Sequence, residues 1–268
     1  MRSGVGAVLG LSVLASASLL SQRAVPRPAP APGRAAVPRV ESPAPFKVGE
    51  TLSYDVSWNL FPVTAGTAVA TVREKKPSFN SMAYYIVVEG RPVPLVARVY
   101  SVYYKMDTLL DTFGLLSQRG SLYSEEGSDR RTSTTRFDRA TRRAFFEQKT
   151  DTTVAADFAV PLQTQDGLAA FYALRGHALK AGDRVTIPVA DSGSLYTTQV
   201  DVGALEPVTV PFGRMNAWKL KIGITDAANQ PVWRDIALWI SNDARRLPVK
   251  MQAELPVGAF VLALREAR

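Results

Sequence analysis

One stretch near the C-terminus shows the pattern around which the chain is organised: Leu238-Trp239-Ile240-Ser241-Asn242-Asp243-Ala244-Arg245-Arg246-Leu247-Pro248-Val249. An apolar run ends at Ile240, and the short polar side chains that follow bond to their own backbone and favour a turn. Apolar residues then recur at every second position towards Leu255 and again from Phe260 to Leu264. Since a period of two is typical of strands buried on one face, Val232 to Leu264 predicts antiparallel strands joined by tight turns.

The same alternation recurs upstream and is clearest from Phe46 to Trp58. The first three strands are close in sequence, so they predict an antiparallel meander. Residues 93–99 fit either a short helix or an apolar loop, because so few residues show no decisive period. Beyond the first, strands are predicted at 65–72, 83–89, 100–106, 115–122, 132–137, 142–147, 184–190, 195–202, 206–210 and 216–222.

One helix is predicted from about 166 to 179, because Leu168, Phe171, Tyr172 and Leu179 recur at spacings close to 3.6. Asp166 suits the positive end of a helix dipole. The fold class is therefore mainly β: a large curled antiparallel sheet or half-barrel with one packed helix, 166–179.

The N-terminus differs in composition from the rest of the chain. Arg2 precedes an apolar segment, and Ala15-Ser16-Ala17 offers the small residues that a signal peptidase accepts. We predict a signal peptide at 1–23, a Pro- and Ala-rich linker at 24–45, and a single antiparallel β domain at 46–268. The alternative for 1–23 is an uncleaved membrane anchor, which would be the only contact with a membrane.

The chain contains no cysteine, which excludes disulfides and the lipid-carrying cysteine of a lipoprotein. Its net charge of +8 is concentrated at the N-terminus. Five arginines and one glutamate precede Phe46, so the domain carries 27 basic and 23 acidic residues, a net charge of +4. This balance argues against nucleic acid as a partner.

Six arginines gather in one segment, at positions 130, 131, 136, 139, 142 and 143. They fit a patch for anionic groups, or a solvated strand face that discourages pairing with another sheet. Three acidic residues near predicted turns, Glu50, Asp138 and Asp243, are predicted to have structural roles, with Asp243 forming a salt bridge to Arg246.

The residues that common enzyme mechanisms need are sparse. His177 is the only histidine, no Gly-x-Ser-x-Gly elbow occurs, and the usual zinc ligand sets cannot be assembled. A pair of carboxylates for glycoside hydrolysis stays open, because only a fold could bring two together. We predict a protein without catalytic residues, metal or cofactor.

Aromatic residues are spread over elements that could face a common interior, and a curled sheet of this size can enclose an apolar cavity. The alternative is that they fill the core. The candidate ligand-binding residues are Tyr54, Trp58, Tyr84, Tyr103, Phe171, Tyr172, Trp218 and Trp239.

Several motifs, in order and spacing, resemble the bacterial family known as domain of unknown function 3108. They are Gly49-Glu50-x-Leu52-x-Tyr54-x-Val56-x-Trp58 with Ala65-Gly66, Phe137-Asp138, Asp166-Gly167-Leu168, Tyr172-Ala173-Leu174-Arg175 and Trp239-x-Ser241-x-Asp243-x-x-Arg246-x-Pro248-Val249. The resemblance implies an exported envelope protein and carries over no catalytic residue. The C-terminal strands are also similar in style to the half-barrel carriers of lipids and lipoproteins in the periplasm, an analogy of fold alone.

Two functions are therefore expected for this chain. The first is a non-catalytic periplasmic binder or carrier of an apolar small molecule or lipid, including the acyl chain of a lipoprotein. The second is a structural or interaction module of the envelope with a packed core, which would present the arginine segment or the sheet edges to a protein partner. A sealed core favours the second, and an open groove lined by the aromatics favours the first.

Overall fold

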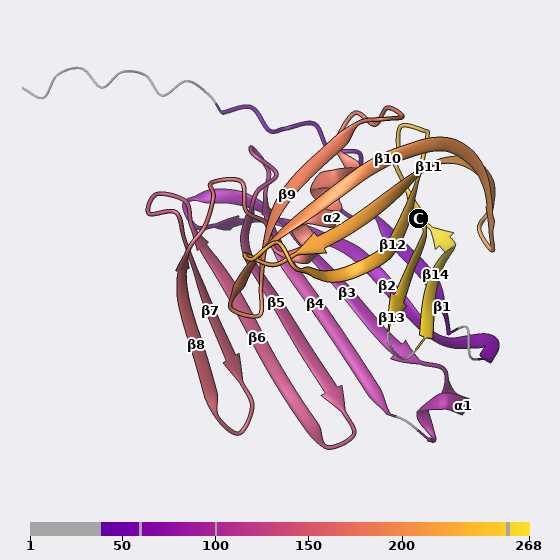
Figure 1. Ribbon diagram of the computed structural model, residues 1–268, viewed down its shortest axis with the longest axis horizontal. Coiled ribbons are helices and arrows are strands. Elements are labelled where there is room, and N and C mark those ends of the chain that lie inside the picture. The colour runs from indigo at the N-terminus through magenta and orange to yellow at the C-terminus, as the bar shows by residue number, and fades with distance from the viewer. Residues whose placement is uncertain (1–38, 59–60, 100, 256–257) are drawn as a thin grey trace, which may run out of the picture. The chain divides into compact units, whose positions relative to one another are not determined.

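A single antiparallel sheet of 14 strands makes up most of the protein (Figure 1). The structure, a computed structural model, describes residues 39–268 with the exception of 59–60, 100 and 256–257. The predicted signal peptide and most of the predicted linker lie outside the described residues. In the first half of the chain the strands are β1 (Thr51–Trp58), β2 (Phe61–Ser78), β3 (Ser81–Pro92), β4 (Val102–Asp111), β5 (Ser117–Glu126), β6 (Asp129–Asp138), β7 (Arg143–Lys149) and β8 (Thr153–Ala159). In the second half they are β9 (Arg184–Asp191), β10 (Ser194–Val210), β11 (Gly213–Thr225), β12 (Pro231–Ser241), β13 (Pro248–Leu255) and β14 (Gly258–Ala267).

The first and last strands pair at the centre of the sheet. The order is β8-β7-β6-β5-β4-β3-β2-β1-β14-β13-β12-β11-β10-β9, so all other neighbours are consecutive in the chain. Leu52 lies opposite Ala267, and Trp58 lies opposite Phe260. The predicted meander is confirmed in β1 to β3, and the sheet has two wings, β2 to β8 and β13 to β9. It does not close into a barrel by hydrogen bonds, which confirms the predicted curled half-barrel.

The β9 wing curves back over the concave face of the sheet (Figure 1). Its longest strand, β10, bends where the register with β11 shifts between Val202 and Leu205. A Cβ at Gly203 would lie 2.8 Å from the carbonyl oxygen of Lys219, so this close approach of two backbones requires glycine. The sequence predicted two strands here, 195–202 and 206–210. That prediction was wrong because a bulge bends one strand without ending it.

Helix α2 (Gly167–Arg175) lies inside the curve of the sheet, between the two wings (Figure 1). Asp166 is its N-cap and accepts a hydrogen bond from the Ala169 N–H at 2.9 Å. The helix ends at Gly176, earlier than the predicted 179. Leu179 is still buried, in the same cluster as Ala170 and Leu174, so its apolar spacing reflected packing rather than a further helical turn.

Three apolar clusters fill the space around α2 and under the curled wing. The first joins β1 and β2 to β10, β11, β12, β13 and β14, and contains Leu52, Tyr54 and Trp239. The second packs α2 on β9 to β12, and the third packs it on β2, β3 and β4. A short helix, α1 (Pro94–Ala97), occupies the segment for which the sequence left helix and loop open.

The turn between β12 and β13 forms where it was predicted, but hydrogen bonds to the Asp243 carboxylate stabilise it instead of a salt bridge to Arg246. The Asp243 carboxylate accepts the backbone N–H groups of Arg245 and Arg246 at 2.9 and 3.1 Å, and the hydroxyl of Ser241 at 3.1 Å. The predicted salt bridge to the Arg246 guanidinium was wrong, because backbone donors one turn away satisfy the carboxylate first. The structural role of Asp138 is confirmed, since it accepts the N–H groups of Ala140 and Thr141.

The segment just before the predicted domain contacts the sheet. Ser42 donates its N–H to the Thr112 carbonyl at 2.9 Å, and Glu41 pairs with Lys75 at 2.5 Å. Phe46 packs edge-on against Tyr84 and Tyr172. The compact unit accordingly begins at Arg39.

Candidate functional site

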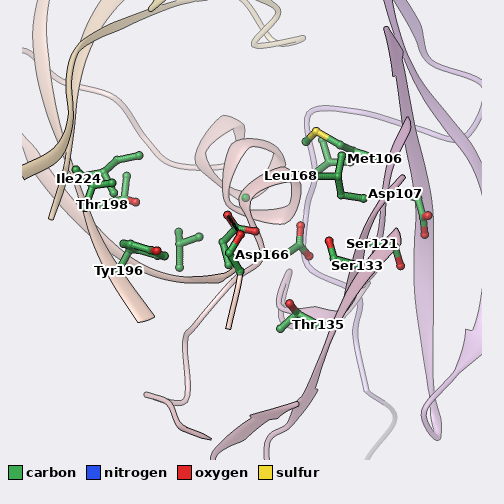
Figure 2. Close-up of a pocket in the computed structure, with 17 residues that line it drawn as sticks. Met106, Asp107, Ser121, Ser133, Thr135, Asp166, Leu168, Tyr196, Thr198 and Ile224 are labelled. Atoms are coloured by element: carbon green, nitrogen blue, oxygen red, sulfur yellow. Dashed lines mark hydrogen bonds between the residues drawn. The ribbon is translucent and has the colours of Figure 1, made fainter. Parts of the chain in front are cut away.

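A cleft of about 520 Å³ opens between the two wings of the sheet, beside the N-terminal end of α2 (Figure 2). One wall comes from β4 to β6, the other from β9 to β12, and the start of α2 lies between them. We call this space the interwing cleft. Its lining residues are Met106, Asp107, Gly120, Ser121, Leu122, Ser133, Thr135, Asp166, Gly167, Leu168, Val189, Asp191, Ser192, Tyr196, Thr198, Ile224 and Val232.

Strand register shows which side chains share one face on each wall of the cleft. Met106 lies opposite Leu122, and Leu122 lies opposite Ser133, so these three share one face of β4 to β6. On the other wall, Thr198 lies opposite Ile224 on β11. Side chains alternate along a strand, which places the neighbours of these residues on the outer face.

Apolar side chains remain partly exposed inside the cleft. Met106, Leu122, Val189 and Ile224 are half-buried, and Val232 at the rim is 45% exposed. Facing apolar groups that do not fill the space between them leave water against apolar surface, which is unfavourable. A ligand that displaced this water would remove the exposed apolar surface from water, and this burial would contribute favourably to the free energy of binding.

Hydroxyl groups line the same space. Ser133 and Thr135 stand on β6, and Tyr196 and Thr198 stand on β10, on opposite sides of the cleft (Figure 2). Each hydroxyl can donate one hydrogen bond and accept others. The cleft therefore combines an apolar surface with neutral polar groups, the usual composition of a ligand-binding site.

Asp166 lines the cleft, but its carboxylate is hydrogen-bonded within the fold. Its carboxylate accepts the hydroxyls of Thr108 and Ser117 at 2.7 and 2.5 Å, besides the N–H of Ala169. Burial raises the pKa of this carboxyl, and the hydrogen bonds it accepts oppose the rise. A Cβ at Gly120 would lie 2.6 Å from the Asp166 side chain, so only glycine leaves room for it.

The other acidic residues of the lining occupy different positions. Asp107 follows Met106 on β4 and lies opposite Ser121, so its side chain is on the other face of the sheet from Met106, where its carboxylate pairs with Arg119. Burial raises the pKa of Asp107, and the Arg119 charge opposes that rise. Asp191 is exposed at the rim, beside the β9–β10 turn.

A buried ion pair connects the last residue of α2 to the residue just before β1. The Arg175 guanidinium donates to both carboxylate oxygens of Glu50, at 2.6 and 2.9 Å, and its side chain is fully buried. It also donates to the carbonyls of Arg245 and Arg246, each at 3.0 Å. One residue of α2 thus ties together the entry to β1 and the β12–β13 turn.

The sequence did not predict that Glu50 and Arg175 are in contact. Both residues nevertheless belong to the motifs that carried the family resemblance. Glu50 and Arg175 are 125 positions apart, and no local pattern links them. The predicted structural role of Glu50 is nevertheless confirmed.

The predicted aromatic residues lie apart from the interwing cleft, and none of them is among its lining residues. Tyr54, Tyr84, Tyr172 and Trp239 are buried in the apolar clusters. Phe171 packs against two of these clusters.

The remaining three predicted residues make local contacts. Trp58 stacks on Phe260, Tyr103 donates its hydroxyl to Glu89 at 2.7 Å, and Trp218 donates its indole N–H to Asn242 at 3.0 Å. The structure does not bring the eight residues together around one space. Most of the cleft residues that sequence reasoning missed are small, hydroxylic or aliphatic, and such residues give no signal of their own.

The arginine segment does not form one continuous patch. Arg139 is half-buried and donates to the carbonyls of Ser117 and Leu162, and burial lowers its pKa to about 10. Arg143 pairs with Asp157 at 2.6 Å, and Arg130 pairs with Glu125 at 3.7 Å.

A second hollow of about 420 Å³ lies beside the C-terminal end of α2, and His177 is among the residues that line it. Among the described residues, no cluster of three or more His, Asp or Glu side chains could hold a metal ion. Of the helices in the described ranges, none is long and apolar enough to cross a membrane.

Comparison with known proteins gives a family and a fold. A family model described as protein of unknown function (DUF3108) matches residues 53–265. No curated protein matches the chain.

Among solved structures, a beta-barrel-like protein of domain of unknown function DUF1849 from Brucella abortus matches 82% of this chain and 97% of its own, at 13% identity and a TM-score of 0.51. A candidate exported protein with a YmcC-like fold from Bacteroides fragilis matches 84% of this chain and 98% of its own, at 10% identity and a TM-score of 0.35. A candidate lipoprotein from Parabacteroides distasonis matches 84% and 98%, at 9% identity and a TM-score of 0.33. The Brucella protein supports the barrel-like fold alone.

Proposed function

Since the chain belongs to the DUF3108 family of proteins of unknown function, we propose a function from its own geometry: an exported protein that binds the apolar part of a ligand in the interwing cleft, without catalysis. The observation that carries this proposal is the 520 Å³ space between two walls of partly exposed apolar side chains. Ligand sites of proteins typically measure about 300 to 1,000 Å³ and combine apolar walls with a few polar groups.

Two further observations support parts of the proposal. The apolar segment after Arg2, with its Ala15-Ser16-Ala17 site, favours export. The small number of catalytic residue types favours binding over catalysis. The lone histidine, His177, is exposed just beyond the C-terminal end of α2 and lines the second hollow instead of the cleft.

The packed aromatic clusters favour a different ligand position from the one that the sequence suggested. The space occupied by Tyr54, Tyr84 and Tyr172 is core, so a ligand there would have to displace close-packed side chains. The cleft needs no such displacement.

A protein-interaction role has one observation in its favour. Strand β8 ends the sheet, so its outer edge is open to pairing with another chain. Asp157 is the only charged residue on this edge strand, which has no proline or lysine to discourage pairing.

The test uses the protein purified from the periplasm without detergent. Its organic extract is compared by mass spectrometry with that of an unrelated periplasmic protein, and binding of the uncharged fluorescent probe N-phenyl-1-naphthylamine is titrated. A stoichiometric apolar compound, or saturable probe binding, supports the proposal.

A matched pair of variants locates the site. Ser133→Trp puts a large side chain into the cleft, and Thr132→Trp puts the same side chain on the outer face of the same strand. We expect the first to lower probe affinity at least about tenfold and the second to leave it unchanged. Probe binding that is absent, or that survives Ser133→Trp intact, sinks the proposal.

A further inference from the structure

The interwing cleft has a marked charge bias. Among the described residues that line it, none is Lys, Arg or His, whereas three are Asp. The surrounding domain has more basic than acidic residues, so this bias is opposite to that of the chain as a whole. An anionic group that entered the cleft would lose water and find no cation in the lining to replace it.

The three aspartates differ in what they can offer to a ligand. Asp166 has its carboxylate oxygens engaged by Thr108, Ser117 and the helix N-terminus. Asp107 is paired with Arg119. Asp191 is exposed at the rim, and its carboxylate accepts a hydrogen bond from the neighbouring Ser192 hydroxyl, at 3.2 Å. Among the three lining carboxylates, Asp191 is therefore the one whose charge is available to interact with a ligand in the cleft.

The neutral polar groups are placed to meet a head group near this rim. Tyr196 and Thr198 follow the β9–β10 turn on one wall, and Ser133 and Thr135 face them from β6 (Figure 2). Hydroxyls can both donate and accept, so they suit an uncharged hydroxyl-bearing group. Next to them in register, Met106, Leu122 and Ile224 offer apolar contact to a chain.

The two wings contact each other beside the β9–β10 turn. A Cβ at Gly193 would lie 3.1 Å from the Phe146 ring, and Ala190 packs in one cluster with Phe137 and Val160. The wings therefore meet there, and the space beside α2 is of the size of one drug-sized or single-chain ligand.

From this arrangement we infer that the ligand is an uncharged single-chain amphiphile with a hydroxyl-bearing head group, and that Asp191 selects against anionic head groups. This inference rests on the proposed function, because it specifies the ligand of the same cleft. It separates the protein from a carrier that holds the carboxylate of a fatty acid or the phosphate of a lipid through Lys or Arg side chains.

The experiment compares two probes with the same acyl chain, uncharged monolauroylglycerol and anionic laurate, below their aggregation thresholds. Each displaces N-phenyl-1-naphthylamine from the full exported protein at neutral pH. We expect monolauroylglycerol to bind at least about tenfold more tightly at low salt. The difference should shrink as salt rises, since Asp191 is exposed and its charge is screened.

Two variants separate Asp191 from the overall charge. Asp191→Lys should strengthen laurate binding about tenfold and leave monolauroylglycerol within about twofold. Asp183→Lys makes the same change in net charge at the other end of β9, roughly 25 Å away at 3.3 Å per residue, and should change neither.

The outcomes distinguish the inference from the proposed function. Equal affinity for both probes, tighter laurate binding, or the same effect from both variants overturns the inference and leaves a binding cleft in place. Binding of neither lipid by a protein that also fails to bind N-phenyl-1-naphthylamine overturns both.

Discussion

Replacement of Glu50 by alanine should destabilise the fold more than any surface change of charge. In the native protein Arg175 donates to both Glu50 oxygens and to two backbone carbonyls, and its side chain has no exposed surface. Glu50→Ala leaves the guanidinium charge buried with two carbonyls and the rings of Phe46 and Tyr172, and removes the carboxylate that balances it. Breaking a buried pair in this way costs about 3 to 5 kcal/mol of the free energy of unfolding. For a domain of this size each kcal/mol lowers the melting temperature by about 2 to 4 °C, so we expect a fall of about 6 to 20 °C.

The assay is urea denaturation followed by tryptophan fluorescence, with calorimetry as a second measure. Asp157→Ala is the control, because it breaks the exposed Arg143 pair and should cost about 0.2 to 1 kcal/mol. The double variant Glu50→Leu with Arg175→Met should recover much of the loss, since apolar residues of similar volume often replace a buried pair without cost. A loss of less than about 1 kcal/mol for Glu50→Ala would refute the assignment of this pair as the link between α2 and β1.

Three further predictions test the fold around the cleft. Gly120→Ala, whose Cβ would lie 2.6 Å from Asp166, should lower the free energy of unfolding by about 1 to 3 kcal/mol through overpacking. Gly223→Ala, whose Cβ meets nothing within 4 Å, is the control and should lower it much less. Equal losses of the two variants in urea melts would contradict this packing. Burial raises the pKa of Asp166 in the folded state, so ionisation of Asp166 weakens the fold. The free energy of unfolding of the native protein should therefore rise, relative to that of Asp166→Asn, as pH falls from the folded pKa of Asp166 towards its unfolded value of about 3.9. A difference in unfolding free energy that stays flat or falls over that window would be the contrary result. Tyr54→Phe removes a hydroxyl that donates to a buried carbonyl at 2.9 Å and should cost about 1 kcal/mol, whereas Tyr172→Phe removes a buried hydroxyl with no partner among the described residues and should be neutral or stabilising in the same melts.

The raised pKa of Tyr54 fits this reading of its environment. Burial is the largest cause of the rise, and it disfavours the charged phenolate. The Tyr54 hydroxyl therefore stays protonated and can act as the donor to the Pro248 carbonyl across the physiological range of pH. This contact joins β1 to the start of β13, next to the central pair of strands.

The sequence by itself determined most of the strands and the single long helix, because these depend on local spacing. Alternation with period two reports a face buried along one strand, and a run of short polar residues reports a turn. The exposed edge strand β8 was missed for the same reason. Its residues, Thr153–Ala159, are mostly exposed and small, so no apolar alternation marks them.

Only the tertiary structure decided which distant residues meet. The pairing of β1 with β14, the Arg175–Glu50 ion pair and the two walls of the interwing cleft all join residues far apart in the chain. Aromatic residues signalled a ligand site in the sequence, yet most of them fill the core, because burial of large rings stabilises a fold whether or not a ligand exists. The cleft is instead lined by residues such as Ser133, Thr198 and Ile224, which are ordinary in any strand. They line a cleft because of how the sheet curls, and the curl depends on contacts between distant strands and on packing around α2.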